Sequence, residues 1–187
     1  ERKFWREREK ELVDKLHIQA TTDQLTGIYN RRVIFEALDE AMDNSKQSKD
    51  RQFATIMFDI DFFKQVNDNY GHAGGDAVLI SFAQLLQSEI SSPNIVGRIG
   101  GEEFLAILYL SPDEAKEFCA KLIKKINNNI VNFEGTEIKV SSSGGVAFST
   151  ETETSADLTN KADERLYDAK KDGRNRFKLI DSELVGD

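Results

Sequence analysis

One short apolar run limits the fold of this chain more than any other feature. Residues 53–60 read FATIMFDI and are apolar almost throughout, with Asp59 near the end of the run and Asp61 directly after it. A run of this length and composition is typical of a central strand that is buried on both faces. We therefore expect a sheet that is covered on both sides, with two carboxylates where this strand ends.

A second segment joins two strand-like halves through a polar turn. Residues 96–108 read VGRIGGEEFLAIL, which predicts a hairpin that turns at Gly100–Glu103. A tight hairpin needs at least one glycine with a positive φ, which accounts for the two glycines but not for Glu102 and Glu103. If this hairpin lies beside the strand at 53–60, Glu102 and Glu103 converge with Asp59 and Asp61.

The rest of the chain alternates helical and extended patterns. Residues 1–20 are highly charged and lack Pro and Gly, which predicts a helical stalk. Trp5, Leu12 and Leu16 lie near heptad spacing, so a coiled coil and a solvated helix docked on the domain are both open. Further helices are expected at 31–47, 62–71, 74–90, 112–130 and 156–173, and further strands at 95–99, 104–109, 138–148 and 176–180. The order β-α-α-β-β-α-β predicts an α+β domain, in which helices flank a mainly antiparallel sheet.

Composition excludes several classes of protein. Acids outnumber bases by 33 to 25 in the 187 residues, and the net charge of −8 disfavours nonspecific binding to nucleic acid or to an anionic membrane. The only cysteine, Cys119, rules out a disulfide framework, favours a reducing compartment, and is expected to be a small buried residue rather than a nucleophile. No apolar run reaches the ~20 residues of a membrane span, and no signal peptide is visible. Because the chain begins with Glu1 rather than Met, we expect a fragment of a longer protein.

Four carboxylates at two loop ends of one sheet suggest a metal site. Clustered carboxylates raise each other's pKa, so a site that keeps several of them ionised usually holds a divalent cation. Oxygen ligands without nearby His or Cys favour Mg²⁺ or Mn²⁺ over zinc. Two alternatives stay open: Asp59 and Asp61 could cap the following helix, and Glu102 and Glu103 could be solvated acids of a turn.

Six motifs carry a resemblance to a known family. RIGGEEF at 98–104 resembles the signature turn of GGDEF-domain diguanylate cyclases, with Glu in place of the first acid. The other five follow in the family's order and approximate spacing: DQLTGIYNRR at 23–32, DIDFFKQVND at 59–68, YGHAGGDAVL at 70–79, SSGGVAFS at 142–149 and ADERLYDAKKDGRN at 162–175. The resemblance implies a ferredoxin-like, polymerase-palm-like catalytic domain over 21–187, preceded by a stalk over 1–20 that links it to an upstream sensor domain.

The resemblance also implies a reaction between two subunits. Two GTP-loaded chains of a homodimer face each other, and the 3′-hydroxyl of each GTP attacks the α-phosphorus of the other, releasing pyrophosphate and forming cyclic di-GMP. Asp59, Glu102 and the carbonyl of Ile60 would hold two Mg²⁺ or Mn²⁺ ions, with a contribution from Glu103. Glu102 is also the family's general base, although metal-assisted deprotonation could suffice.

Phosphate contacts are implied at the start of the helix after Asp61 and near the C-terminus. The backbone amides of Phe62 and Phe63 lie at a helix start, where phosphates bind, while their side chains are expected to pack in the core. The cations are Lys64, Lys170 and Arg174. For the last two, a favourable interaction with a helix C-terminus is the alternative.

Base recognition is implied for Asn67 and Asp76. An ionised aspartate only accepts hydrogen bonds, which suits the paired donor edge that guanine has and adenine lacks. Asp76 therefore argues for GTP on both sides and against a mixed GMP–AMP dinucleotide. The alternatives are a helix N-cap for Asp76 and a helix-end role for Asn67. His72 either lines the nucleotide site or orders the turn at Gly71.

The chain departs from the family at one regulatory site. Many members carry Arg-x-x-Asp upstream of the signature, whereas this chain has SSPN at 91–94, without the Arg that clamps phosphate or the Asp. We expect no tight product inhibition through that site. The resemblance places the domain in the bacterial cytoplasm, either free or as the cytosolic part of a larger sensor. The competing hypothesis is a degenerate GTP-binding regulatory module without turnover.

Overall fold

A six-stranded sheet lies at the centre of the computed structural model, which describes residues 2–180 and 184–186. Its strands run in the order β2-β3-β1-β6-β7-β8. All neighbours are antiparallel except β6 and β7, as predicted for a mainly antiparallel sheet. The strands are β1 (Ala54–Ile60), β2 (Ile95–Gly100), β3 (Glu103–Leu108), β6 (Ser142–Phe148), β7 (Arg176–Lys178) and β8 (Leu184–Gly186).

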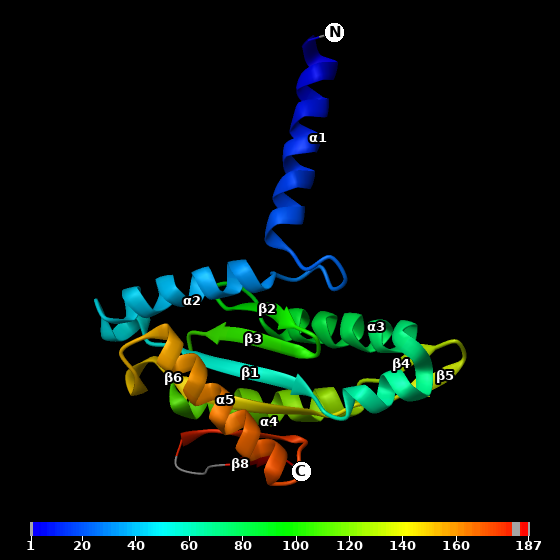
Figure 1. Cartoon of the computed structure of the whole chain (residues 1–187). Helices are drawn as coiled ribbons and strands as arrows, with labels where there is room; N and C mark the ends of the chain where they lie inside the picture. Colours follow the sequence, from blue (N-terminus) through cyan, green and yellow to red (C-terminus); the bar gives the residue numbers. More distant parts are fainter. Residues whose placement is uncertain (1, 181–183, 187) are drawn as a thin grey trace.

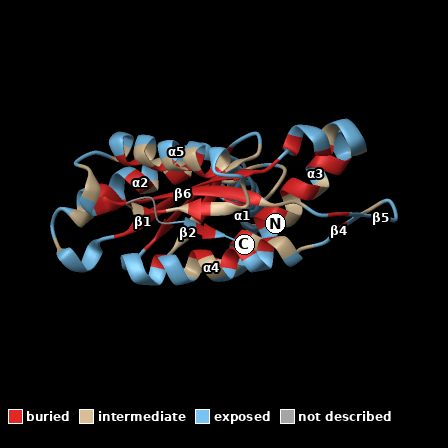
Figure 2. Ribbon diagram, turned by 90° about the horizontal axis from the view of Figure 1, so that it is seen from below, coloured by how far each residue is buried: buried red, intermediate tan, exposed pale blue. Residues whose placement is uncertain are grey.

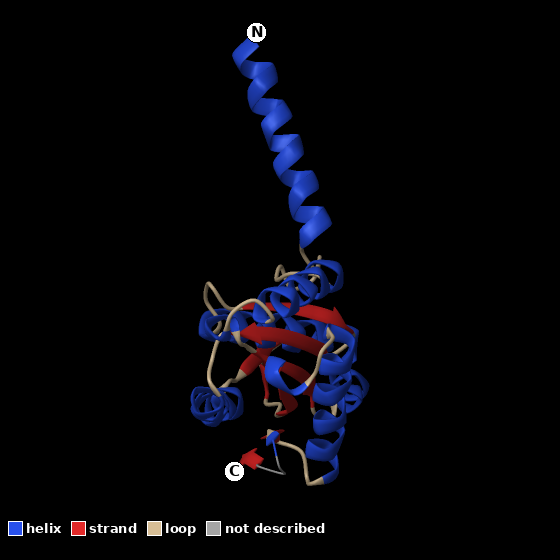
Figure 3. Ribbon diagram, turned by 90° about the vertical axis from the view of Figure 1, so that its left-hand side faces the viewer, coloured by secondary structure: helices blue, strands red, loops and turns tan. Residues whose placement is uncertain are grey.

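Helices cover both faces of this sheet (Figures 1 and 3). One face packs on α3 (Phe63–Glu89) and α4 (Pro112–Asn128), and the other on α2 (Arg31–Ser45) and α5 (Ser155–Lys171). Alternate residues of β1 serve the two cores: Phe58 belongs to the first and Met57 to the second. Every residue of β1 is buried, as the apolar run predicted, and Figure 2 shows this buried layer between the helices.

Local signals fix where the helices begin. The side chain of Asn30 caps α2, and Thr154 caps α5. The start of α4 has a capping box, in which Ser111 and Glu114 satisfy each other's backbone N–H groups. Caps of this kind are typically worth ~1 kcal/mol each. None of the helices in the described part of the chain combines the length and apolarity needed to cross a membrane.

The stalk helix α1 (Arg2–Thr21) stands away from the domain (Figure 1). Residues 3–20 are all exposed, including Trp5 and Leu16, which are 65% and 64% exposed. The alternative in which this helix docks on its own domain is therefore wrong.

One predicted strand was wrong in detail, whereas a predicted helix break was right. The single strand expected at 138–148 is divided, because β6 begins only at Ser142, and β5 (Thr136–Ile138) pairs instead with β4 (Val131–Phe133) in a separate hairpin. The helix break expected at Gly71 is confirmed, because Gly71 adopts the non-helical angles φ +70° and ψ 174°, and α3 consists of two helical segments that meet at this kink. Two short 3₁₀ helices, η1 (Lys49–Arg51) and η2 (Ser149–Glu151), complete the described elements.

Candidate functional site

The signature turn lies directly beside the end of β1. Asp59 is opposite Glu103 in the antiparallel register of β1 and β3. The N–H of Ile60 donates to the carbonyl of Glu102 over 3.3 Å. Gly101 turns the hairpin with φ +45°, which a residue with a side chain rarely adopts. β1 and β3 are thus neighbours, which is the condition for convergence of their acids.

Asp59 is the buried acid of this group. Its carboxylate lies 2.9 Å from the Nζ of Lys170 on α5. Burial raises the pKa of Asp59 to about 6; Lys170 opposes the rise, and the charges of Glu102 and Glu103 add to it. A buried carboxylate beside two others is the environment in which a divalent cation would be stabilised most.

The oxygen donors fit Mg²⁺, although they do not form a cage. Within residues 2–180 and 184–186, no group of three or more His, Cys, Asp or Glu side chains is arranged to hold a metal ion. Mg²⁺ is commonly held by one or two carboxylates together with substrate phosphates, rather than by protein ligands alone. The donor set therefore suits an ion that arrives with a nucleotide.

Asp61 does not join this group. Its carboxylate is buried and accepts hydrogen bonds from Ser141 Oγ at 2.7 Å, Ser143 Oγ at 2.7 Å and the backbone N–H of Asn175 at 3.0 Å. The N-cap of α3 is Phe62, and no side chain caps it. The alternative in which Asp59 or Asp61 caps this helix is therefore wrong, and Asp61 instead ties α3 to the chain after α5.

The predicted phosphate contacts lie around this connection. Phe62 adopts φ +55° and is 54% exposed, so the prediction of core packing is wrong for Phe62 and right for the buried Phe63. The guanidinium of Arg174 lies 4.7 Å from the centre of the Phe62 ring, which is cation–π distance. Lys64 is exposed at the start of α3. Lys170 is in the last turn of α5, where the helix C-terminus also favours a cation.

Small residues of β6 allow α5 to pack close to the sheet, which places Lys170 beside Asp59. A Cβ on Gly145 would lie 1.8 Å from the carbonyl oxygen of Ala162 and 2.4 Å from the N of Leu166, so the backbone of α5 rests directly on β6. Ser141 and Ser143 of the same run hold Asp61. The sequence showed this run of small residues, and the close packing of α5 on β6 together with the bonds to Asp61 explains it.

The predicted base-binding residues lie along the bend of α3. Asn67 is half-buried before the bend, whereas His72 and Asp76 are exposed beyond it. Asp76 is inside the helix rather than at its start, so the N-cap alternative is wrong. The backbone places Asn67 against Gly75, the neighbour of Asp76.

Sequence reasoning missed the role of Arg98. Its Nε donates to the carbonyl of Gly101 at 2.9 Å, and its Nη1 donates to Asp23 at 3.1 Å. Burial alone would raise the pKa of Asp23, but hydrogen bonds from Thr26 and Arg98 lower it below its usual value. Arg98 therefore joins the signature turn to the loop below the stalk. Arg98 and Asp23 both belong to motifs that carry the family resemblance, and this was the only sign of their contact in the sequence.

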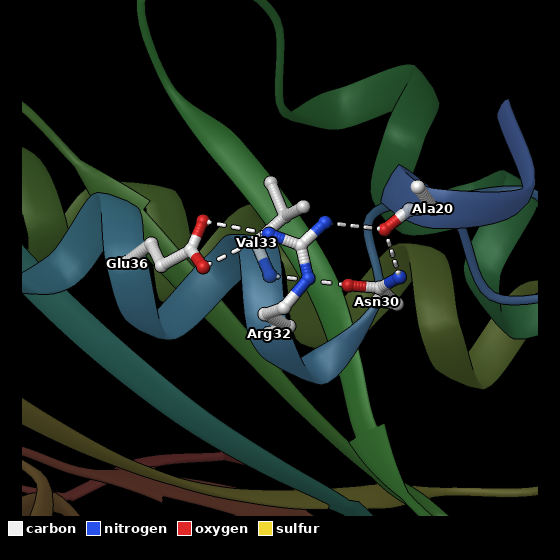
Figure 4. Close-up of polar contacts among 5 residues, drawn as sticks. All are labelled: Ala20, Asn30, Arg32, Val33 and Glu36. Atoms are coloured by element: carbon white, nitrogen blue, oxygen red, sulfur yellow. Dashed lines mark hydrogen bonds and ion pairs between the residues drawn. The ribbon is translucent and has the colours of Figure 1, made fainter. Parts of the chain in front are cut away.

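The stalk itself ends in a capped junction (Figure 4). The carbonyl of Ala20 accepts hydrogen bonds from Asn30 Nδ2 at 3.0 Å and from Arg32 Nη2 at 2.6 Å. The same Asn30 accepts from the N–H of Val33 at 3.1 Å, at the start of α2. One amide thus caps the end of α1 and the beginning of α2, which fixes the two helices to each other.

Two further positions are settled by their contacts. At the position of the family's inhibitory motif, the N–H of Asn94 donates a hydrogen bond to the carbonyl of Ser91. The side-chain Oδ1 of Asn94 accepts a hydrogen bond from the N–H of Tyr109 at 2.8 Å. Cys119 is buried as expected, and burial raises the pKa of its thiol to about 12.

Comparisons with known proteins converge on one family. The family model described as "Diguanylate cyclase, GGDEF domain" matches residues 20–176. Diguanylate cyclase A of Treponema denticola is 34% identical over 88% of this chain and 45% of its own length, and DgcS of Shewanella oneidensis is 35% identical over 91% and 56%. The chain therefore spans about half the length of these curated relatives.

Solved structures agree with the sequence comparison. The coiled coil and GGDEF domain of DgcB from Caulobacter crescentus, in complex with c-di-GMP, superposes with a TM-score of 0.86 at 26% identity and 93% coverage of both chains. SiaD of Pseudomonas aeruginosa, in complex with its activator SiaC, gives a TM-score of 0.83 at 32% identity, covering 95% of this chain and 68% of that chain.

Proposed function

The chain belongs to the GGDEF family, and we propose that it is a diguanylate cyclase that condenses two GTP molecules into cyclic di-GMP. The observation that carries this proposal is the buried Asp59, which lies beside the Glu102–Glu103 turn and pairs with Lys170. Neighbouring acids with one cation, near exposed basic and aromatic groups, suit a triphosphate that arrives with divalent metal. Degenerate family members would be expected to lose these acids first, and here all three are present.

In the proposed reaction two subunits face each other, each with one GTP. The 3′-oxygen of one GTP forms a bond to the α-phosphorus of the other, and the bond from that phosphorus to the bridging oxygen breaks. Pyrophosphate leaves, and the proton of the hydroxyl passes to Glu102 as general base. Repetition with the roles exchanged closes the ring. Each subunit contributes half of the reaction centre, so the homodimer is the catalytic unit.

Asp59, Glu102 and the carbonyl of Ile60 would hold two Mg²⁺ ions, with Glu103 as a further ligand. When bound, these ions would neutralise phosphate charge and stabilise the leaving pyrophosphate. Lys170 lies 2.9 Å from Asp59 and would offset part of the negative charge of the acids, of which Glu102 and Glu103 are half-buried.

The triphosphate would bind between α3 and the loop after α5. The backbone amides of Phe62 and Phe63 lie at a helix start that no side chain caps, so they are suited to phosphate oxygens. Arg174 is held near them by its stacking on Phe62, and Lys64 supplies a flexible charge from the exposed side of α3.

The guanine base would be read by Asn67 and Asp76, with His72 at the edge of the site. A site built on a hydrogen bond that only guanine can make can discriminate by ~10⁴ against an analogue that cannot form it. Because Asp76 accepts but does not donate, it favours the ring N–H and amino group of guanine over adenine.

Residues 1–20 are proposed as the stalk through which an upstream sensor sets the encounter of two catalytic domains over 21–187. The exposed apolar side chains of α1 suit a parallel pairing with a second copy. The absence of Arg and Asp at 91–94 predicts that added cyclic di-GMP does not inhibit initial rates through that site.

One assay tests the proposal. The protein is incubated with Mg²⁺ and either GTP alone or GTP with ATP, and the products are identified by mass spectrometry. Cyclic di-GMP as the only dinucleotide in both mixtures supports the proposal. A mixed dinucleotide would contradict the role of Asp76. Bound GTP that is never turned over, at a concentration where the chain is dimeric, would favour the regulatory module instead.

A further inference from the structure

Two successive glycines, Gly74 and Gly75, follow the bend of α3 at Gly71. Gly74 and Gly75 are buried, while the nearby His72 and Asp76 are exposed. Both glycines lie within a helix, where glycine costs ~1 kcal/mol relative to alanine. Two unfavourable residues in succession indicate that something else occupies the space of their missing side chains.

What occupies that space differs between the two glycines. A Cβ on Gly75 would lie 1.9 Å from Oδ1 of Asn67 and 3.2 Å from the ring of Phe63. A Cβ on Gly74 would lie 2.4 Å from the Cβ of Tyr70 and 3.5 Å from the ring of Phe133. Of these two glycines, only Gly75 lies against a residue to which the proposed function gives a role in base recognition, Asn67.

We propose that Gly75 is a positioning residue for guanine recognition: it leaves the space that the amide of Asn67 occupies beside Asp76. This inference rests on the proposed function, because it assumes that these two residues read the base. An asparagine amide offers one acceptor and two donors in a fixed plane, so its value for recognition depends on its position. The neighbouring Asp76 supplies acceptors only.

The geometry gives the size of the expected displacement. Ordinary contact of a Cβ begins at 3.4 Å, whereas the amide oxygen of Asn67 would be at 1.9 Å from an alanine Cβ at position 75. The Asn67 amide is the end of a rotatable side chain and can move away without unfolding the helix. Gly75→Ala therefore improves the helix propensity of α3 and displaces the amide of Asn67 from its place against residue 75.

The test compares Gly75→Ala with the control Gln84→Ala, which replaces an exposed residue of the same helix. The ligand is a GTP analogue with a methylene group between its α- and β-phosphates, with Mg²⁺, and binding is measured by calorimetry together with thermal unfolding. Gly75→Ala should weaken binding of the GTP analogue by about 10-fold or more, the loss expected for one hydrogen bond to the base. It should also reduce the preference over the corresponding ATP analogue. Gln84→Ala should leave both quantities close to those of the wild type.

A double variant separates the proposed role from a packing role. In an Asn67→Ala background, Gly75→Ala should cause no further loss of affinity, because the displaced amide is already absent. Should Gly75→Ala fail to fold alone, recovery of folding in the double variant supports the same role. A double variant that also fails to fold shows that Gly75 serves packing against Phe63, and this overturns the inference.

The remaining outcomes are distinguishable. Wild-type protein that binds the GTP analogue, together with a Gly75→Ala variant that binds it equally well, overturns this inference alone. Equal losses from Gly75→Ala with and without Asn67 also overturn it. Wild-type protein that binds neither analogue overturns the proposed function, and this inference with it.

Discussion

Replacement of Asp59 by asparagine should stabilise the metal-free protein at neutral pH. Burial raises the pKa of Asp59 from 3.8 to about 6, against the opposing effect of Lys170 and with the help of Glu102 and Glu103. A carboxyl group whose pKa is higher in the folded state binds protons more tightly when folded. The folded state is therefore favoured below pH ~4 and loses stability as the pH rises through ~6. A difference of about 2 pKa units corresponds to about 3 kcal/mol.

Urea unfolding in the presence of EDTA measures this effect. The free energy of unfolding of Asp59→Asn, minus that of the wild type, should grow from below about 1 kcal/mol near pH 4 to about 3 kcal/mol at pH 8. Asp68→Asn, an exposed acid on α3, gives the background. Mg²⁺ should stabilise the wild type at pH 8 more than the asparagine variant. A difference that is the same at both pH values would refute the reasoning.

Two further substitutions test the supports of the site by urea unfolding. Asp61→Ala should lower the free energy of unfolding by about 3 kcal/mol, because the hydroxyls of Ser141 and Ser143 lose their buried acceptor; a loss below about 1 kcal/mol would contradict this. Arg165→Ala should cost a similar ~3 kcal/mol, because it leaves the half-buried Glu151 without its 2.6 Å ion pair. Arg165→Lys should recover part of that loss, and equal stability of all three proteins would refute the role of the pair.

The proximity of Asp59 to the signature turn could be predicted from sequence because each part is local. An apolar run with an acid at its end indicates a buried strand, and two glycines between strand-like halves indicate a hairpin. Only the pairing of β1 with β3 had to be assumed, and the register of Asp59 with Glu103 confirms it.

The supports of the site could not be predicted because they join distant parts of the chain. Ser141 and Asp61 are 80 residues apart, and Arg98 and Asp23 are 75 residues apart. No local pattern shows which polar side chains meet across a sheet. The hairpin of β4 and β5 was missed for a different reason: its strands have 3 residues each, which is too short for a periodic pattern.

The dependence of activity on subunit association tests the central claim most directly. At saturating GTP and Mg²⁺, pyrophosphate release per subunit is measured over a series of protein concentrations, and the dimer fraction of the same samples is measured by analytical ultracentrifugation. If two facing subunits form one reaction centre, the rate per subunit follows the dimer fraction, with one cyclic di-GMP formed for every two pyrophosphates. Monomeric samples that make cyclic di-GMP at an undiminished rate per subunit would contradict the account.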